Sequence, residues 1–166
     1  MISEQHSSTA KADFPSDLPE MLIRGEITLA DAFGLDRNAL YEIAGIAYGL
    51  FSSGKLCEAK EIYSGLVAAD PYDSVFHCHL AAVHHRLGEI EDAYRQYTKS
   101  LNLNSANVDA MVGHAEIQLS RGDVSAAVSG LKRAIEIDPD VSRPSIARAR
   151  ALLLAVEARA HSEEFS

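Results

Sequence analysis

The sequence predicts an all-α protein built from three tandem helix-turn-helix repeats, because residues of the same kind recur at one constant spacing. The period is 34 residues, and three series of small residues keep it: Gly54, Gly88 and Gly122; Ala47, Ala81 and Ala115; Ala59, Ala93 and Ala127. A series of large residues keeps the same register at Tyr63, Tyr97 and Leu131. Agreement of several registers at one period indicates stacked repeats rather than a generic helical bundle.

Each repeated residue type has a structural reason. A glycine suits the turn after the first helix, where the backbone takes a left-handed conformation. The alanines suit places where two helices cross closely. A period of 34 with these residues is typical of the tetratricopeptide repeat, a pair of antiparallel helices. The units close at Asp70 and Pro71, at Asn104 and Ser105, and at Asp138 and Pro139, so the repeats are expected at residues 40 to 73, 74 to 107 and 108 to 141.

The segments on either side of the repeats have different expected roles. Residues 1 to 16 carry too few apolar side chains for a core and are predicted to be a disordered tail. Residues 17 to 39 are predicted to be an N-terminal helical segment that either caps the first repeat or forms a dimer contact. Its apolar residues for that purpose are Leu18, Met21, Leu22, Ile27, Leu29 and Phe33. Ser142 and Pro144 suit the start of a C-terminal capping helix over residues 142 to 161, and residues 162 to 166 are expected to fray.

Composition excludes several classes of function. The formal net charge is -9, from 24 acidic against 15 basic residues, which argues against binding nucleic acid or an acidic membrane surface. No apolar run approaches the ~20 residues of a membrane span. The two cysteines form no CxxC motif and no secretory signal sequence is found, so we expect a reducing cytoplasm. A glycine-rich phosphate loop, a GxSxG elbow and an HExxH motif are all absent from the sequence, which predicts a binding protein without a cofactor rather than an enzyme.

The concave face of the superhelix is the predicted binding site for an extended peptide, because the first helix of each repeat lines it. Helical spacing assigns to this groove Tyr41, Ala44, Tyr48, Phe51, Val75, Cys78, His79, Ala82, His85, Asp109, Val112 and Glu116, together with Gly45, Ser52, Arg86, Gly113, Leu119 and Ser120. Tyr48 and Phe51 are predicted to hold an apolar anchor side chain, and the alternative is that both pack on the N-terminal helices. The residues expected to face the second helices instead are Ile43, Ile46, Leu50, Leu80, Met111 and Ala115.

Histidine is concentrated in one predicted helix, at His77, His79, His84 and His85, beside Cys78. A metal site on a helix commonly uses ligands three or four residues apart. The gaps between the residues at 77 to 79 and those at 84 and 85 run from five to eight, so no metal site is predicted. His84 and His114 are interpreted as polar side chains between neighbouring helices.

Beyond the repeat, several stretches resemble the class II type III secretion chaperones. They are MLIRGEITL at 21 to 29, the pair Leu40 and Tyr41, Ala47 and Tyr48 with Phe51 before the Ser-Gly-Lys at 53 to 55, and above all DPYDSVF at 70 to 76. The similarity covers about residues 18 to 160. It implies that three repeats form a groove that holds an extended segment of a hydrophobic translocator protein. Such a chaperone keeps translocators soluble and unassembled in the bacterial cytoplasm until secretion.

The resemblance also has consequences for single residues and for assembly. Tyr48 and Phe51 match groove aromatics of that family by position, whereas Ala44 stands where an aromatic residue is often found. The family dimerises through its N-terminal helices, which favours the dimer interpretation of residues 17 to 39. Two alternatives stay open at this point: a generic repeat scaffold that joins two proteins, and a chaperone that also acts as a transcriptional co-activator.

Overall fold

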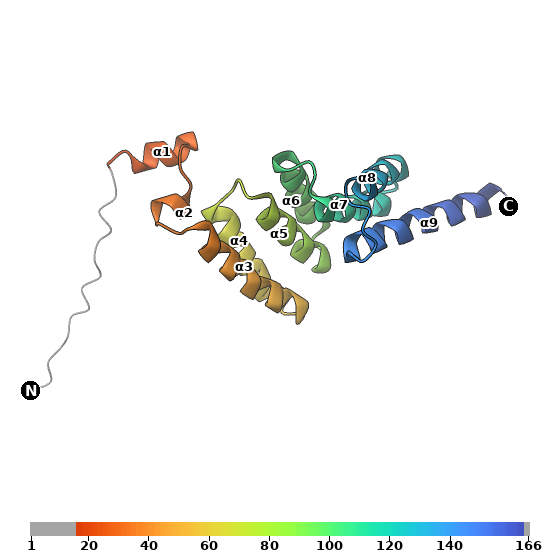
Figure 1. Cartoon of the computed structure of the whole chain (residues 1–166), viewed down its shortest axis with the longest axis horizontal. Helices are drawn as coiled ribbons and strands as arrows, with labels where there is room; N and C mark the ends of the chain where they lie inside the picture. Colours follow the sequence, from red (N-terminus) through yellow and green to blue (C-terminus); the bar gives the residue numbers. More distant parts are fainter. Residues whose placement is uncertain (1–15, 165–166) are drawn as a thin grey trace, which may run out of the picture.

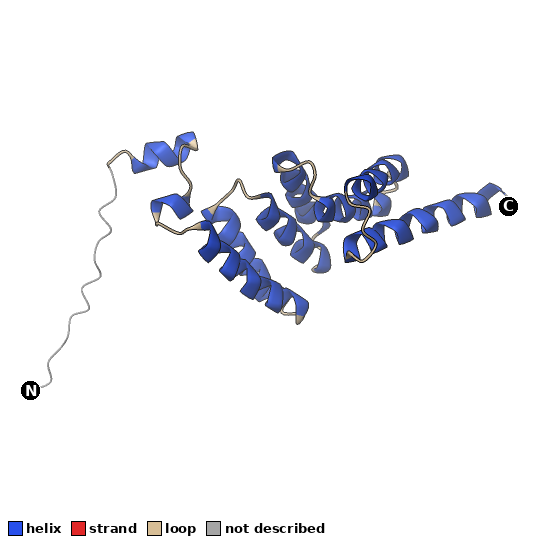
Figure 2. Ribbon diagram, in the orientation of Figure 1, coloured by secondary structure: helices blue, strands red, loops and turns tan. Residues whose placement is uncertain are grey.

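The computed structural model describes residues 16 to 164, and within this range the regular elements are all α-helices (Figure 2). The predicted fold class is confirmed. The predicted disordered tail, apart from Ser16, and the last two residues of the chain lie outside the described residues.

Three helical hairpins and a final helix follow one another along the longest axis of the molecule, with α1 and α9 toward opposite ends (Figure 1). The hairpins are α3 (Arg37–Ser52) with α4 (Leu56–Ala69), α5 (Ser74–Arg86) with α6 (Ile90–Leu103), and α7 (Val108–Ser120) with α8 (Val124–Ile137). The final helix is α9 (Pro144–Glu164). Among the described residues α3 contacts α5, α5 contacts α7 and α7 contacts α9, so these first helices form one layer and the second helices another.

Two helix ends differ from the predicted boundaries. Helix α3 begins at Arg37 rather than at residue 40, because the Asp36 carboxylate accepts a hydrogen bond from the backbone N–H of Ala39 and so caps the helix earlier. Helix α9 runs to Glu164, three residues past the predicted end of the capping helix at residue 161.

The repeated small residues lie where the period placed them. Gly54, Gly88 and Gly122 have φ angles of 82°, 78° and 80°, the left-handed conformation that ends each first helix. The six repeated alanines have no exposed surface. A larger side chain at these crossings would force the helix axes apart.

The joins between repeats keep one conformation even where the sequence varies. Asp70, Asn104 and Asp138 end the second helices with φ angles of -134°, -143° and -133°. The middle join therefore has the same geometry although it lacks a proline.

The N-terminal segment forms two short helices, α1 (Leu18–Arg24) and α2 (Leu29–Ala32). The Thr28 side chain and the Asp31 carboxylate cap α2 reciprocally, as in a capping box. Leu22, Ile27 and Leu29 line a cavity of about 330 Å³ together with Ala68, Pro71 and Tyr72 of the first repeat and its join. Part of the segment thus covers the first repeat, as the capping interpretation expected.

One prediction about the interior is wrong. Ile43 and Ile46 do not face the second helices, and Ile46 is 62% exposed. Leu80 occupies the same position of the next repeat and packs in the core with residues of the first repeat. Helix α3 has no repeat before it, so its equivalent face stays uncovered. Leu80, Met111 and Ala115 are buried as predicted, and Leu50 is partly buried.

Within the described residues, none of the helices combines the length and the apolar character that a membrane crossing requires.

Candidate peptide-binding groove

An aromatic patch, defined here as Tyr48, Phe51 and His79, lies between α3 and α5. The ring centroids of Tyr48 and Phe51 are 6.4 Å apart, and the Tyr48 ring meets the His79 ring edge-on at 6.0 Å. Tyr63 of α4 stacks on the other side of His79 at 5.2 Å. Tyr48 remains 54% exposed, so the patch offers an open aromatic surface. Its ring neighbours come from α3, α4 and α5, not from the N-terminal helices of the alternative interpretation.

Arg86 closes one side of this patch. Its guanidinium carbon lies 4.7 Å from the centroid of the Phe51 ring, and its Nη1 donates a hydrogen bond to the Phe51 carbonyl oxygen at 3.0 Å. A cation over an aromatic face is attracted by the ring quadrupole. The contact fixes Phe51 against α5 while leaving the edge of the patch basic.

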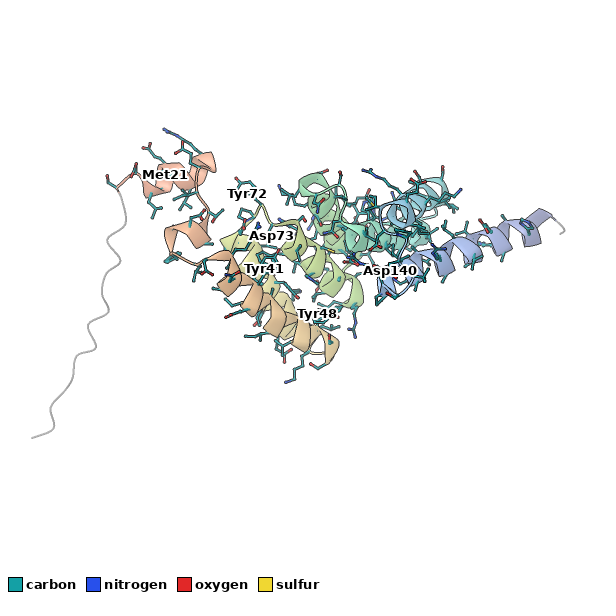
Figure 3. The ribbon with its side chains drawn as sticks, in the orientation of Figure 1. Met21, Tyr41, Tyr48, Tyr72, Asp73 and Asp140 are labelled. Atoms are coloured by element: carbon teal, nitrogen blue, oxygen red, sulfur yellow. The ribbon has the colours of Figure 1, made fainter. Side chains whose placement is uncertain are left out.

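Tyr41, near the N-terminal end of α3, contacts the start of α5 and does not project freely into the groove (Figure 3). Its hydroxyl donates to Asp73 Oδ2 at 2.9 Å, and Asp73 also caps α5 by accepting from the backbone N–H groups of Val75 and Phe76. Burial and the neighbouring Asp73 carboxylate raise the pKa of Tyr41 to about 12. Tyr41 therefore connects two repeats as well as bordering the groove.

A small cavity of about 230 Å³ brings together four predicted groove residues: Val75, Cys78, His79 and Asp109. Arg143 of the last join closes it by donating to Asp109 at 2.8 Å. Burial raises the pKa of the Cys78 thiol to about 12. The thiol stays protonated at neutral pH, so Cys78 contributes shape rather than reactivity.

A polar cluster, defined here as His85, Glu116 and Arg148, spans α5, α7 and α9. Arg148 Nε lies 2.9 Å from Glu116 Oε1, and His85 Nδ1 lies 3.9 Å from Glu116 Oε2. Glu116 is thus engaged by two basic side chains. Both Glu116 and His85 are partly exposed, so the cluster adjoins solvent.

Four of the predicted groove residues are buried, and the first three of them belong to core clusters: Ala44, Cys78, Val112 and Gly113. Val112 has no exposed surface and packs with Leu131, and Ala44 is also buried. Their spacing put them on the inner side of the first helices, but close contacts between neighbouring repeats cover that part of each helix. Ala82 is partly exposed and remains available to the groove.

The histidines have protein partners. His77 contacts the Gln96 side chain at 2.7 Å and the Pro71 carbonyl at 3.0 Å, and His114 stacks on Tyr94 at 4.5 Å. His84 Nδ1 lies 2.5 Å from Glu89 Oε2, and these two with Asp92 hold ligand atoms within 4.8 Å of one another. The Lys60 ammonium already binds both Glu89 oxygens, at 2.8 and 3.1 Å. A metal ion would have to displace this lysine.

No protein-family model matches the chain, but comparison with known proteins gives several relatives. The low calcium response locus protein H of Yersinia pestis is 26% identical over 121 residues, which cover 73% of this chain and 72% of the relative. The translocator chaperone SycD of Yersinia enterocolitica superposes with a TM-score of 0.67 at 25% identity, covering 78% of this chain and 98% of SycD. The resemblance to type III secretion translocator chaperones is confirmed.

Two solved translocator chaperones hold peptides. SycD has been seen with a peptide of the translocator YopD, at a TM-score of 0.65 and 25% identity over 75% of this chain and 97% of SycD. PcrH has been seen with the chaperone binding region of PopD, at a TM-score of 0.65 and 28% identity over 76% of this chain and 96% of PcrH. A tetratricopeptide repeat domain of Spaghetti is similar at 20% identity with a TM-score of 0.62, which shows the fold alone.

Sequence reasoning assigned Arg86 and Phe51 to the groove but did not predict their contact, and it left out Tyr97. Arg86 and Phe51 are 35 residues apart, and the repeat period does not predict that a cation lies above an aromatic ring. Tyr97 was interpreted only as a core residue of the repeat. The signal in the sequence that could have drawn attention to it is Gly113, a glycine inside a predicted helix.

Proposed function

We propose that this chain is a type III secretion chaperone that binds an extended segment of hydrophobic translocator proteins along its concave groove. The observation that carries the proposal is the open aromatic patch, with Tyr48 54% exposed beside Phe51 and His79 on the first-helix layer. An aromatic pocket can hold an apolar anchor side chain of a bound peptide. The peptide complexes of SycD and PcrH support the same use of this fold.

Such binding would keep a translocator soluble and unassembled before secretion in the bacterial cytoplasm. A membrane-seeking protein aggregates in water through exposed apolar surface, and occupying a segment that drives assembly is enough to prevent this. The task needs no catalysis, no cofactor and no direct contact with nucleic acid or membrane. Its chaperone relatives belong to a non-enzymatic class, which supports a binding role.

The chain is further proposed to form a homodimer through its N-terminal end. Leu29 and Phe33 of the segment at residues 17 to 39 are exposed, while Leu18, Met21, Leu22 and Ile27 are partly buried. The uncovered face of α3 with Ile43 and Ile46 adds exposed apolar surface near this end. Contiguous apolar surface of this kind marks contact sites between proteins. SycD has been described in an alternative dimer, which supports the proposal.

Binding to peptides tests the proposed function. An array of overlapping peptides that tile the translocator proteins of the same organism would be probed with the full-length chain, and the tightest peptide measured by calorimetry. We expect saturable binding to one short segment and a soluble complex when the whole translocator is co-expressed with the chain. If no array peptide binds and the translocator is equally soluble without the chain, the scaffold interpretation is favoured.

A further inference from the structure

Each second helix inserts one large side chain into the seam between two first helices. Tyr63 of α4 donates a hydrogen bond to the Ala44 carbonyl of α3 at 3.2 Å and stacks on His79 of α5. Tyr97 of α6 packs with Cys78 of α5 and with Ala110 and Ile117 of α7. Leu131 of α8 packs among residues of α7 and α9. The three seams are equivalent by the 34-residue period, but their side chains differ in chemistry.

Among the described residues the Tyr97 hydroxyl makes no hydrogen bond, and its oxygen reaches solvent although the residue as a whole is only 3% exposed. A tyrosine hydroxyl at the edge of a core usually has a hydrogen-bond partner, either in the protein or in the solvent. The nearby His85 ring meets the Tyr97 ring edge-on at 6.5 Å between centroids. Glu116 is already engaged by Arg148 and His85. The Tyr97 hydroxyl is therefore able to donate a hydrogen bond to a bound molecule.

Gly113 leaves the space that the Tyr97 ring and hydroxyl occupy. A Cβ atom at residue 113 would lie 2.2 Å from Tyr97 Cζ and 2.4 Å from the hydroxyl oxygen, so any larger residue would push the ring away. Glycine is unfavourable inside a helix such as α7, which argues that the space is useful here. Gly113 and Glu116 are three residues apart and share one side of α7. The hydroxyl thus reaches the side of α7 that carries the polar cluster of the groove.

We propose that the Tyr97 hydroxyl is a ligand-binding group that donates a hydrogen bond to a backbone carbonyl of the extended client segment. The inference rests on the proposed function and adds a polar contact between the second and third repeats to the aromatic patch of the first. An extended segment has carbonyl groups without partners of its own, and these require donors from the groove. A glycine in the floor lets a backbone approach closely. The client is recognised here through its main chain.

Two matched substitutions test this, because Tyr63 and Tyr97 are equivalent by period and differ in whether the hydroxyl is bonded within the chain. Tyr97→Phe should weaken binding of the tightest array peptide by about three- to tenfold, the worth of one hydrogen bond. Its melting temperature should stay at or above that of the parent, since no internal bond is lost. Tyr63→Phe should lower the melting temperature by about 2 to 4 °C and leave the dissociation constant unchanged.

The outcomes separate this proposal from the proposed function. If the parent binds its peptide and Tyr97→Phe binds equally well, water satisfies the hydroxyl and the inference is wrong, while the proposed function stands. If Tyr97→Phe loses as much thermal stability as Tyr63→Phe, the hydroxyl has a structural role and the inference is also wrong. A parent chain that binds no array peptide overturns the proposed function itself, before either variant is measured.

Discussion

At the scale of single residues, packing between repeats depends on pairs of side chains that are matched in size. Tyr97 lies against Gly113. In the following seam Leu131 packs in a cluster with Ile146 and Ala149 of α9. The period explains why each seam receives a large side chain from a second helix. It does not explain why the Tyr97 ring lies against a glycine, which only the short distance from the ring to a Cβ built at residue 113 shows.

Gly113→Ala should therefore destabilise the chain, although alanine is the better helix former by about 1 kcal/mol. Forcing a methyl group against the Tyr97 ring should lower the free energy of unfolding by about 1 to 3 kcal/mol. Adding Tyr97→Leu, which removes the ring and introduces the residue found at the equivalent position 131, should recover part of this loss. Urea unfolding followed by circular dichroism measures both, and a Gly113→Ala chain as stable as the parent would contradict the packing argument.

The buried histidines make stability depend on pH. Burial lowers the pKa of His79 below its usual value near 6.5, with partial opposition from Asp109 and Asp73, and burial also lowers the pKa of His114. The unfolded chain then binds more protons than the folded chain below about pH 6.5. The contribution is complete above that pH and is lost as the pH falls toward the folded pKa values.

We expect the free energy of unfolding to fall between about pH 7 and pH 5, with a smaller slope in His79→Gln. His161→Gln, an exposed position on α9, serves as the control and should keep the parent slope. Urea titrations at several pH values measure the slope. An unchanged slope in His79→Gln would show that His79 is not responsible.

Zinc should leave the melting temperature within about 1 °C of the metal-free value, because Lys60 already binds the Glu89 carboxylate at the point where His84 and Asp92 converge. The side chains approach one another across the turn between α5 and α6, which the spacing of histidines alone did not reveal. Thermal melts with low micromolar zinc or with a chelator make the measurement. Stabilisation by several degrees that disappears in His84→Ala would establish a metal site.

At the scale of helices, much of the chain could be predicted from sequence, because the determinants are local. The positive φ angles of the turn glycines and the buried alanines follow directly from the period. The exposed face of α3 could not be predicted, since Ile46 and Leu80 occupy the same place in their repeats and differ only in what precedes them. Burial of Val112 likewise depends on how closely neighbouring repeats approach.

The N-terminal helices are separable from the repeats in a way that can be tested. Deleting residues 1 to 35 keeps Asp36, which caps α3, so the repeats should stay folded. If α1 and α2 carry the dimer contact, light scattering should report a dimer for the full-length chain and a monomer for the truncated one. Leu29→Asp with Phe33→Asp in the full chain should have the same effect. Monomers in both the full-length and the truncated chain would refute the dimer proposal.

At the scale of the whole molecule, the four first helices form a continuous layer whose character changes along its length. The end formed by α3 and α5 carries the aromatic patch with Arg86, and the end formed by α7 and α9 carries Glu116 with Arg148. A bound segment would meet apolar contacts at one end and polar contacts at the other. The sequence predicted which helices form this face, but the ion pairs that connect residues distant in sequence appear only in the structure.

The most direct test of the account is the affinity of Tyr48→Ala and Phe51→Ala for the tightest translocator peptide. Loss of an anchor pocket at an interface hot spot costs ~2 kcal/mol or more, so binding should weaken by about tenfold to a few hundredfold. Arg86 should still bond the carbonyl of residue 51, which helps the fold to persist. Lys99→Ala, an exposed position on the second-helix layer, should bind like the parent. If both aromatic variants keep the parent circular dichroism spectrum and bind the peptide as tightly as the parent, the concave groove is not the client site.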